Sequence, residues 1–394
     1  MREAASVFRV VLALGATQML AWAAYYLPAI LADPIARDLA TSPNTLFAAF
    51  SVSLLISALF GPAVGRHIDV LGGRGVLALS NVAFALGLAL MGLAHGPVML
   101  FVAWAILGIA MSLGLYDAAF AALGRLYGLE ARMPITGVTL MGGLASTTAW
   151  PLTAWGVGAI GWRETCFAWA AAHLLLALPL NLTMIPRAAL QPHGETPVAR
   201  PHVPMDRRMW LLAFAFAAGW MVTAAMAAHM PRLIQQAGAS YADAVLAASL
   251  LGPAQVAARF AEFALARNFH PLTTARIAAL GHPLGAAMLA AFGAVMSIPF
   301  SLLHGAGNGI LTIARGTVPL AVFGPDNYGY RIGLLGAPAR IAQAFAPLLF
   351  GLLIDTYGLA TIVLTSALSL AALVSLMLVP TSPPPAHTNA GNTT

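Results

Sequence analysis

The sequence predicts an all-α membrane protein with 12 transmembrane helices arranged as two six-helix bundles. Composition is the first reason: 60% of the 394 residues are hydrophobic, 8% are charged, and the mean hydropathy is +0.84. That balance leaves too little polar surface to keep a globule of this size in water. The second reason is that apolar runs of roughly 20 residues, each long enough to cross a bilayer as a helix, recur about a dozen times. One basic, proline-rich stretch divides these runs into two sets.

The first six apolar runs predict an N-terminal bundle over residues 1–186. The first run is longer than a signal-peptide core. It ends in Ala32-Asp33-Pro34 rather than in a small-residue cleavage site, so we expect it to be a retained span. The expected spans of this bundle are residues 8–31, 44–64, 75–94, 98–123, 134–159 and 164–185.

Residues 187–208 predict a polar cytoplasmic linker, because this stretch is rich in proline and arginine and holds no sustained apolar run. A second bundle is expected over residues 209–380, and residues 381–394 predict a disordered cytoplasmic tail. Gly281, His282 and Pro283 interrupt the ninth run, and Gly293 and Pro299 lie near its junction with the tenth, which leaves the boundaries of these two spans open by several residues. The expected spans of the second bundle are residues 209–230, 242–266, 277–291, 295–314, 332–354 and 359–379.

The placement of arginines predicts that both termini are cytoplasmic. With the N-terminus inside, only Arg37, Arg163 and Arg232 would face the outside, against 14 arginines near cytoplasmic ends of spans. Basic residues are retained on the cytoplasmic side during insertion. We therefore expect an integral plasma membrane protein, in a bacterium an inner membrane protein. The 14 arginines are Arg2, Arg9, Arg66, Arg74, Arg125, Arg132, Arg187, Arg200, Arg207, Arg208, Arg267, Arg276, Arg315 and Arg331.

The loop between the second and third spans, residues 65–74, carries a motif. Its sequence GRHIDVLGGR places Gly65, Asp69, Gly72 and Arg74 at the positions of a glycine, an aspartate, a second glycine and a basic residue. Together with six plus six spans around a basic central stretch, this loop resembles the cytoplasmic loop of the major facilitator superfamily. The resemblance extends over nearly the whole chain.

The motif departs from the family pattern where Val70 and Gly73 occupy positions that are usually basic. The resemblance implies the major facilitator fold and a cytoplasmic charge latch, in which Asp69 and Arg74 are gating residues rather than substrate ligands. The alternative is an ordinary solvated loop with an arginine that obeys the positive-inside rule.

Residues 115–179 suggest a branch of the superfamily. Tyr116-Asp117, Gly142-Gly143, Pro151 and Gly161-Trp162-Arg163 resemble bacterial relatives of the monocarboxylate and oxalate/formate porters. The glycine-proline motif that drug/proton antiporters carry in their fifth span is absent, because Pro151 follows Gly143 by eight residues and precedes no second glycine pair.

Four ionisable residues fall inside expected spans: Asp117, Arg259, Glu262 and Arg340. A charge inside a bilayer costs about 2.5 kcal/mol or more by insertion scales and is normally retained for function. Two guanidinium groups at one cavity would bind a carboxylate or dicarboxylate, because the planar fork of arginine matches carboxylate oxygens and stays charged. We therefore predict that Arg259 and Arg340 bind substrate. The resemblance to the oxalate/formate porters implies the same, since they use buried cations on the corresponding helices.

The alternative is structural: Arg259 pairs with Glu262, Arg340 pairs with Asp117, and neither pair contacts substrate. Glu262 and Asp117 are also the candidates for carrying a coupling proton, because the pKa of a buried carboxylate can rise into the working range.

Two polar stripes recur at helical spacing. Trp22 and Tyr25 in the first span and His304 and Asn308 in the tenth are expected to line a path for substrate. The alternatives are an interfacial aromatic belt for the first pair and a histidine hydrogen-bonded between helices for the second. We interpret His173, Asn181 and His282, on spans that usually face outward in this fold, as packing or interhelical hydrogen-bonding residues.

The sequence holds no phosphate-binding glycine loop that ends in lysine and no metal-ligand spacing, so we expect no enzyme, cofactor or metal site. The predicted function is alternating-access transport of a small organic anion such as a mono- or dicarboxylate, coupled to protons. The expected partners are this substrate, the coupling proton and membrane lipid, without nucleic acid, and the expected assembly is a monomer. The rival interpretations are an exporter of neutral or cationic drug-like compounds and a membrane sensor that does not transport.

Overall fold

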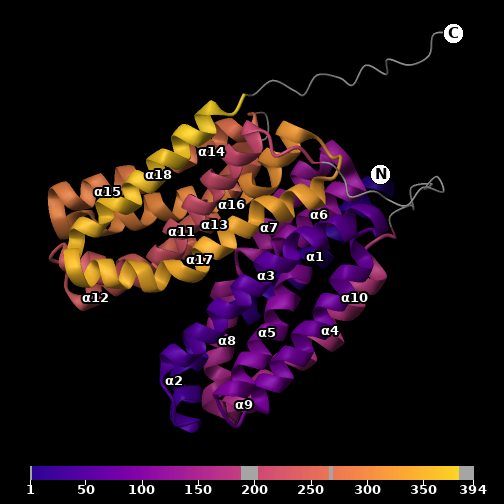
Figure 1. Ribbon diagram of the computed structural model, residues 1–394, viewed down its shortest axis with the longest axis horizontal. Coiled ribbons are helices and arrows are strands. Elements are labelled where there is room, and N and C mark those ends of the chain that lie inside the picture. The colour runs from indigo at the N-terminus through magenta and orange to yellow at the C-terminus, as the bar shows by residue number, and fades with distance from the viewer. Residues whose placement is uncertain (1, 188–202, 266–268, 381–394) are drawn as a thin grey trace.

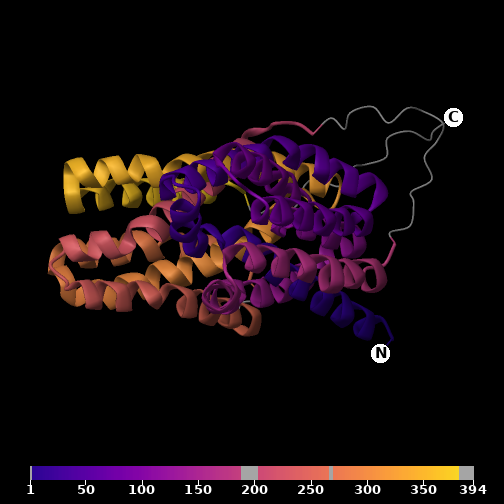
Figure 2. The same cartoon turned by 90° about the horizontal axis from the view of Figure 1, so that it is seen from below.

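The computed structural model describes residues 2–187, 203–265 and 269–380, and every regular element in these ranges is helical. Two lobes of helices lie side by side (Figures 1 and 2). The predicted tail and most of the predicted linker lie outside the described residues. The first lobe contains α1 (Arg2–Tyr26), α2 (Pro28–Asp38), α3 (Pro43–Leu71), α4 (Gly73–Gly92), α5 (Pro97–Gly114), α6 (Tyr116–Tyr127), η1 (Gly128–Ala131), α7 (Arg132–Gly142), α8 (Ala145–Ile160), α9 (Trp162–Ala172), η2 (His173–Ala177) and α10 (Leu178–Met184).

The second lobe repeats this pattern of long helices and short turns. It contains α11 (Arg207–Gln236), α12 (Tyr241–Ser249), α13 (Leu251–Leu265), α14 (Pro271–Ala279), α15 (Gly281–Phe292), η3 (Gly293–Met296), α16 (Ser297–Phe323), α17 (Tyr328–Tyr357), η4 (Gly358–Ala360) and α18 (Thr361–Leu378).

Helix boundaries follow the local chemistry of proline and glycine. Proline opens α3 and α5, where its missing N–H costs nothing and its fixed φ suits the first turn. Gly72 and Gly161 end α3 and α8 with φ of 84° and 94°, a conformation that strains any residue with a Cβ. Each of the twelve predicted spans is largely helical in the structure, although several are broken into two helices.

Nine apolar stretches of the described residues are long enough to cross a membrane. Three of them exceed 50 residues and hold several helices each, so nine counts uninterrupted stretches rather than crossings. The membrane class is therefore confirmed, and the number of twelve crossings stays a prediction.

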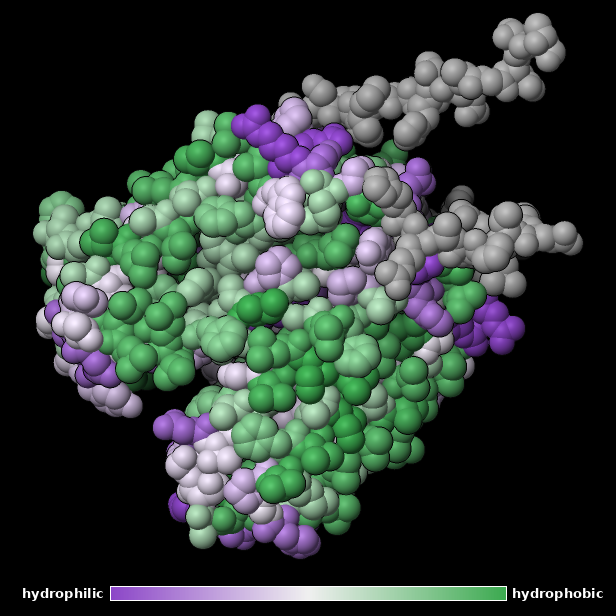
Figure 3. Space-filling view, in the orientation of Figure 1, coloured by the Kyte–Doolittle hydropathy of each residue, from purple (hydrophilic) through white to green (hydrophobic). Residues whose placement is uncertain are grey.

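Each lobe buries its own apolar core and exposes further apolar residues at its surface. Trp104 and Phe120 are fully buried in the first lobe, as are Phe300 and Phe350 in the second. Apolar residues also cover most of the visible surface of both lobes, and hydrophilic residues gather toward their ends (Figure 3). A surface of this kind suits hydrocarbon rather than water.

The lobes meet where α3 packs against α17. A Cβ on Gly65 would overlap the carbonyl oxygen of Gly329, and one on Gly333 would lie 2.5 Å from the carbonyl oxygen of Gly61. Two glycines four residues apart on each helix therefore allow the backbones to touch, as small residues do at helix crossings in membranes. The start of α1 and the end of α18, the described ends of the chain, lie on the side where the lobes touch (Figure 1), and a notch separates the lobes at the opposite end (Figure 3).

Candidate functional site

Three charged side chains meet between the lobes, where α6 of the first lobe faces α16 and α17 of the second. We call this contact, together with the packing of α3 on α17, the seam. Oδ2 of Asp117, from α6, accepts hydrogen bonds from Nη2 of Arg315 on α16 at 2.7 Å and from Nη2 of Arg340 on α17 at 3.0 Å. Asp117 lies in the first turn of α6, where the helix dipole favours a carboxylate. Gly336 leaves room for the cluster, because a Cβ there would lie 2.8 Å from Nη2 of Arg315 and 3.0 Å from Oδ2 of Asp117.

The structure corrects the prediction that Arg315 lies at a cytoplasmic end. The expected tenth span stopped at residue 314, whereas α16 continues to Phe323 and carries Arg315 into the seam, where it is 6% exposed. Its guanidinium also lies 5.2 Å from the centre of the Trp220 ring. The helical spacing that Arg315 shares with His304 and Asn308 is the signal in the sequence that could have placed it inside the second lobe.

The third buried arginine, Arg259 of α13, makes its hydrogen bonds to neutral groups. Nη1 donates to the carbonyl oxygen of Thr139 in the first lobe at 3.0 Å, and Nη2 donates to Oε1 of Gln255 at 3.4 Å. The guanidinium lies against Gly143, where a Cβ would overlap Nη1. Within the described ranges no carboxylate lies within ion-pair distance of Arg259.

The alternative pairing proposed from the sequence is therefore half right. Arg340 pairs with Asp117, but Arg259 does not pair with Glu262. Glu262 lies 3.7 Å from Nη2 of Arg132, which comes from α7 of the other lobe. The error arose because spacing along one helix was used to choose the partner, and here the nearest opposite charge belongs to a different helix.

The ion pair of Glu262 and Arg132 is part of a contact between the lobes. Arg132 also donates to the carbonyl oxygen of Phe269 at 2.7 Å. Next to it, His270 caps α14 by accepting from the N–H of Leu272 at 3.2 Å. Burial, followed by the positive charges of Arg132 and Arg276, lowers the pKa of His270, which favours the neutral ring that this cap requires.

The aromatic residues of α1 lie next to these charges. The Tyr25 hydroxyl accepts from Nε2 of Gln343 on α17 at 2.6 Å, a hydrogen bond across the seam. The Trp22 ring is buried, 4.9 Å from the ring centres of both Tyr25 and Tyr116. These side chains thus face the interior and the seam, which removes the interpretation as a membrane-surface belt.

His304 and Asn308 lie elsewhere, inside the second lobe. His304 hydrogen-bonds His282 at 3.0 Å, and Oδ1 of Asn308 accepts from Thr223 at 2.9 Å. The structure therefore does not bring them together with Asp117, Arg340 and the aromatic cluster. The predictions for His173 and His282 are confirmed: His173 hydrogen-bonds Asn81 at 2.9 Å, and His282 bridges α15 to α16 and α18.

Asp69 joins the lobes on the side of the chain termini. Its Oδ1 and Oδ2 accept from the backbone N–H groups of Gly329 and Tyr330, both at 2.8 Å. A carboxylate from α3 thus caps the N-terminus of α17 and neutralises the positive end of its dipole. For Arg74 no ion pair or side-chain hydrogen bond is found among the described residues.

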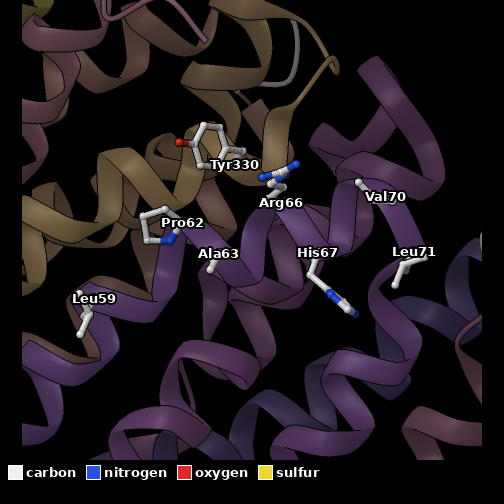
Figure 4. Close-up of a pocket in the computed structure, with 8 residues that line it drawn as sticks. All are labelled: Leu59, Pro62, Ala63, Arg66, His67, Val70, Leu71 and Tyr330. Atoms are coloured by element: carbon white, nitrogen blue, oxygen red, sulfur yellow. The ribbon is translucent and has the colours of Figure 1, made fainter. Parts of the chain in front are cut away.

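A groove runs along the outside of the same seam, with a volume of about 600 Å³. Most of its lining comes from α3, between Leu59 and Leu71, and Arg66 and Tyr330 lie near each other between these ends, while His67 points away from them (Figure 4). The groove is separate from the buried charges, because none of the three buried arginines lines it.

Three comparisons bear on the identity of the fold. Residues 12–303 match the family model of the Major Facilitator Superfamily. An uncharacterized 38 kDa protein in the 23S RNA operon of Thermoproteus tenax is 30% identical over 354 residues, which cover 84% of this chain and 90% of that protein.

Two solved structures share the architecture at low sequence identity. The human organic anion transporter TETRAN aligns with a TM-score of 0.67 and 16% identity, over 94% of this chain and 99% of that one. The proton:xylose symporter XylE, bound to 6-bromo-6-deoxy-D-glucose, aligns with a TM-score of 0.73 and 13% identity, over 96% of each chain. At these identities the likeness concerns the fold alone. With the family model matching most of its length, the chain belongs to the major facilitator superfamily.

Proposed function

We propose that this protein transports a small organic anion, such as a mono- or dicarboxylate, by alternating access between its two lobes. The observation that carries the proposal is an excess of positive charge at the seam. Arg315 and Arg340 share the single carboxylate of Asp117, and Arg259 has only neutral partners among the described residues.

Uncompensated charge in a membrane protein is costly, so a cluster of this kind favours an anion that supplies the missing negative charge. Guanidinium groups bind carboxylates through two parallel hydrogen bonds and keep their charge when partly desolvated. The neighbouring rings of Trp22, Tyr25 and Tyr116 give the site an apolar wall. An organic acid with a short carbon skeleton would match both features.

Asp117 would compete with the substrate for the two arginines, which links binding to movement of the lobes. In the present conformation its carboxylate occupies the guanidinium groups that a substrate carboxylate would use. Binding of the anion would replace Asp117, and because Asp117 belongs to one lobe and both arginines to the other, the exchange would loosen the seam. Substrate occupancy would thereby be linked to the relative position of the lobes.

The latch at Asp69 and the glycine contacts between α3 and α17 would close one side of the protein while the notch on the other side is open. Opening that seam exposes the site to the side of the termini, which we expect to be the cytoplasm. Import and export differ in the gradients that drive this cycle, not in these contacts.

Proton coupling is part of the proposal, with Asp117 and Glu262 as the carboxylates expected to take part. Both are held by arginine here, Asp117 by two side chains and Glu262 by Arg132. Protonating either one would release its ion pairs between the lobes. The carboxylates therefore suit a gating role, in which charge neutralisation permits the seam to open.

The purified protein in liposomes tests the proposal. Labelled monocarboxylates, dicarboxylates, a neutral sugar and a lipophilic cation are offered separately, with and without an inward proton gradient. Accumulation of a carboxylate but of neither other class supports the proposal. Flux of the cation alone would establish the drug-export alternative, and binding of a carboxylate without flux would establish the sensor.

A further inference from the structure

A chain of hydrogen bonds crosses the interior of the second lobe, away from the arginines. The Thr365 hydroxyl donates to the carbonyl oxygen of Ile362 at 2.9 Å and contacts Nε2 of His282 at 2.9 Å. Nδ1 of His282 in turn lies 3.0 Å from Nδ1 of His304. Both rings are buried, and Nε2 of His304 has no hydrogen-bond partner in the described structure.

One assignment of the ring hydrogens makes all three hydrogen bonds at once. With the single hydroxyl hydrogen of Thr365 on the carbonyl oxygen of Ile362, Nε2–H of His282 is the donor to the Thr365 oxygen. A neutral His282 then has no hydrogen on Nδ1, which accepts from Nδ1–H of His304. A neutral His304 consequently has a bare lone pair on Nε2. All hydrogen bonds of this chain point the same way, from His304 through His282 to Thr365 and Ile362. Nε2 of His304 is left as a buried acceptor without a donor in the described structure.

A small cavity, about 40 Å³, adjoins the two histidines. Helices α11, α14, α15, α16 and α18 enclose it, and its polar lining comes from His282, His304, Asn308, Thr223 and Ser369. A cavity of this size with several polar groups accommodates water. Among the described residues that line it, the two histidines are the only titratable ones. The arginines of α14 and α16, Arg276 and Arg315, donate to other partners, the carbonyl oxygen of Leu376 and the carboxylate of Asp117.

We propose that the histidine pair takes up the coupling proton, at Nε2 of His304, and that water in this cavity delivers it. This inference rests on the proposed proton-coupled transport. The step is a proton transfer: hydrated H⁺ in the cavity gives its proton to the lone pair of Nε2, an N–H bond forms, and neutral water remains. The pair then carries one positive charge, and the reverse transfer releases the proton.

The hydrogen bond between the two rings stabilises the charged pair. Protonated His304 donates from Nδ1 to neutral His282, a charge-assisted hydrogen bond that is stronger than the neutral one. The Phe300 ring packs beside both histidines, with its centre 5.7 Å from that of His282 and 6.3 Å from that of His304. Burial opposes the charge, so protonation requires the cavity to be hydrated. The proton therefore responds to the conformation of the lobe, which is the condition for coupling.

The test variant is His304→Asn, because the asparagine amide places an N–H where Nδ1–H lies and has no atom at Nε2. His282→Gln is the second variant, since its amide reaches the position of Nε2 and keeps the contact with Thr365. His173→Gln is the control: His173 is equally buried in the first lobe, and its partner is the amide of Asn81.

Two kinds of flux are measured for each protein in liposomes. Uptake driven by a proton gradient should be lost in His304→Asn and in His282→Gln. Exchange of labelled for unlabelled carboxylate at equal pH, which moves no net proton, should continue in both. His173→Gln should retain both fluxes. Gradient-driven uptake that survives in His304→Asn at the wild-type level would overturn the proposal.

Failure of the proposed function has a different signature, since wild-type protein would then move no carboxylate by either route. In that case the pair is tested directly by nitrogen NMR of labelled histidines between acidic and neutral pH. The proposal expects a shared titration of two ring signals that disappears in both variants. If no such coupled titration exists in the wild type, the proposal is wrong.

Discussion

Asp117 and Arg340 lie 223 positions apart in the chain, yet Oδ2 of Asp117 accepts from Nη2 of Arg340 at 3.0 Å. Arg315 donates to the same oxygen, while Oδ1 is buried without a partner in the described structure. One carboxylate thus ties the first lobe to two arginines of the second. While Asp117 holds both guanidinium groups, a substrate carboxylate cannot bind them. The cap at Asp69 and the glycine contacts between α3 and α17 hold the seam closed beside it.

Removing the charge of Asp117 should make the protein more dependent on a bound anion. Asp117→Asn leaves two buried guanidinium groups without a counter-ion, at a cost of about 3–5 kcal/mol to stability. A substrate carboxylate should restore most of that loss. Thermal unfolding of the solubilised protein, with and without carboxylate, measures both effects. If the carboxylate stabilises wild type more than Asp117→Asn, then Asp117 does not compete with the substrate.

Gly143→Ala should weaken anion transport without unfolding the protein. The new methyl group would occupy the space of Nη1 of Arg259, which must move off the carbonyl oxygen of Thr139. Gly158→Ala is the matched control, because a Cβ at Gly158 meets nothing within 4 Å. The Michaelis constant for uptake should rise in the first variant only. Equal constants in the two variants would mean that the position of Arg259 is irrelevant to binding.

Asp69→Asn should open the seam on the side of the termini. The amide keeps one acceptor oxygen but loses the charge that faces the N-terminus of α17, a loss of about 1–2 kcal/mol to the closed form. Distances between spin labels placed on the two lobes report the populations directly. An unchanged distance distribution would show that this carboxylate does not control closure.

Gly65→Ala should prevent closure by sterics rather than by charge. Its Cβ would overlap the carbonyl oxygen of Gly329, and backbone cannot move aside as a side-chain end can. Gly75→Ala, on neighbouring α4, meets nothing within 4 Å and serves as the control. Accessibility of a seam cysteine to a water-soluble thiol reagent should rise in Gly65→Ala alone. Equal labelling of the two variants would contradict the role assigned to the glycine contact.

The helices and the buried charges could be predicted from the sequence because both follow from hydropathy along the chain. Asp117, Arg259 and Arg340 stand out among the charges within apolar runs, and the structure places all three at or beside the seam, with both arginines buried and Asp117 partly buried. Arg315 was misplaced because a span boundary is set by packing, and α16 extends nine residues past Ala314 against the other lobe.

The ion-pair and hydrogen-bond partners of these side chains could not be predicted from the sequence, because they depend on which helices pack together. Nothing near Glu262 in the sequence indicates Arg132, and nothing near His304 indicates His282. Gln255 and Arg259 lie one turn apart on a single helix, and helical spacing is enough to bring these two side chains together. The same argument failed for Glu262, whose face of α13 turns toward α7.

Arginine dependence of transport is the most direct test of the anion site. Uptake of a labelled carboxylate into liposomes is compared for wild type, Arg259→Gln, Arg340→Gln and the control Arg232→Gln, whose ion pair with Asp355 is exposed at the surface. We predict that uptake is lost in both seam variants and retained in the control, with all four proteins folded. Carboxylate uptake that persists without both seam arginines would contradict the account.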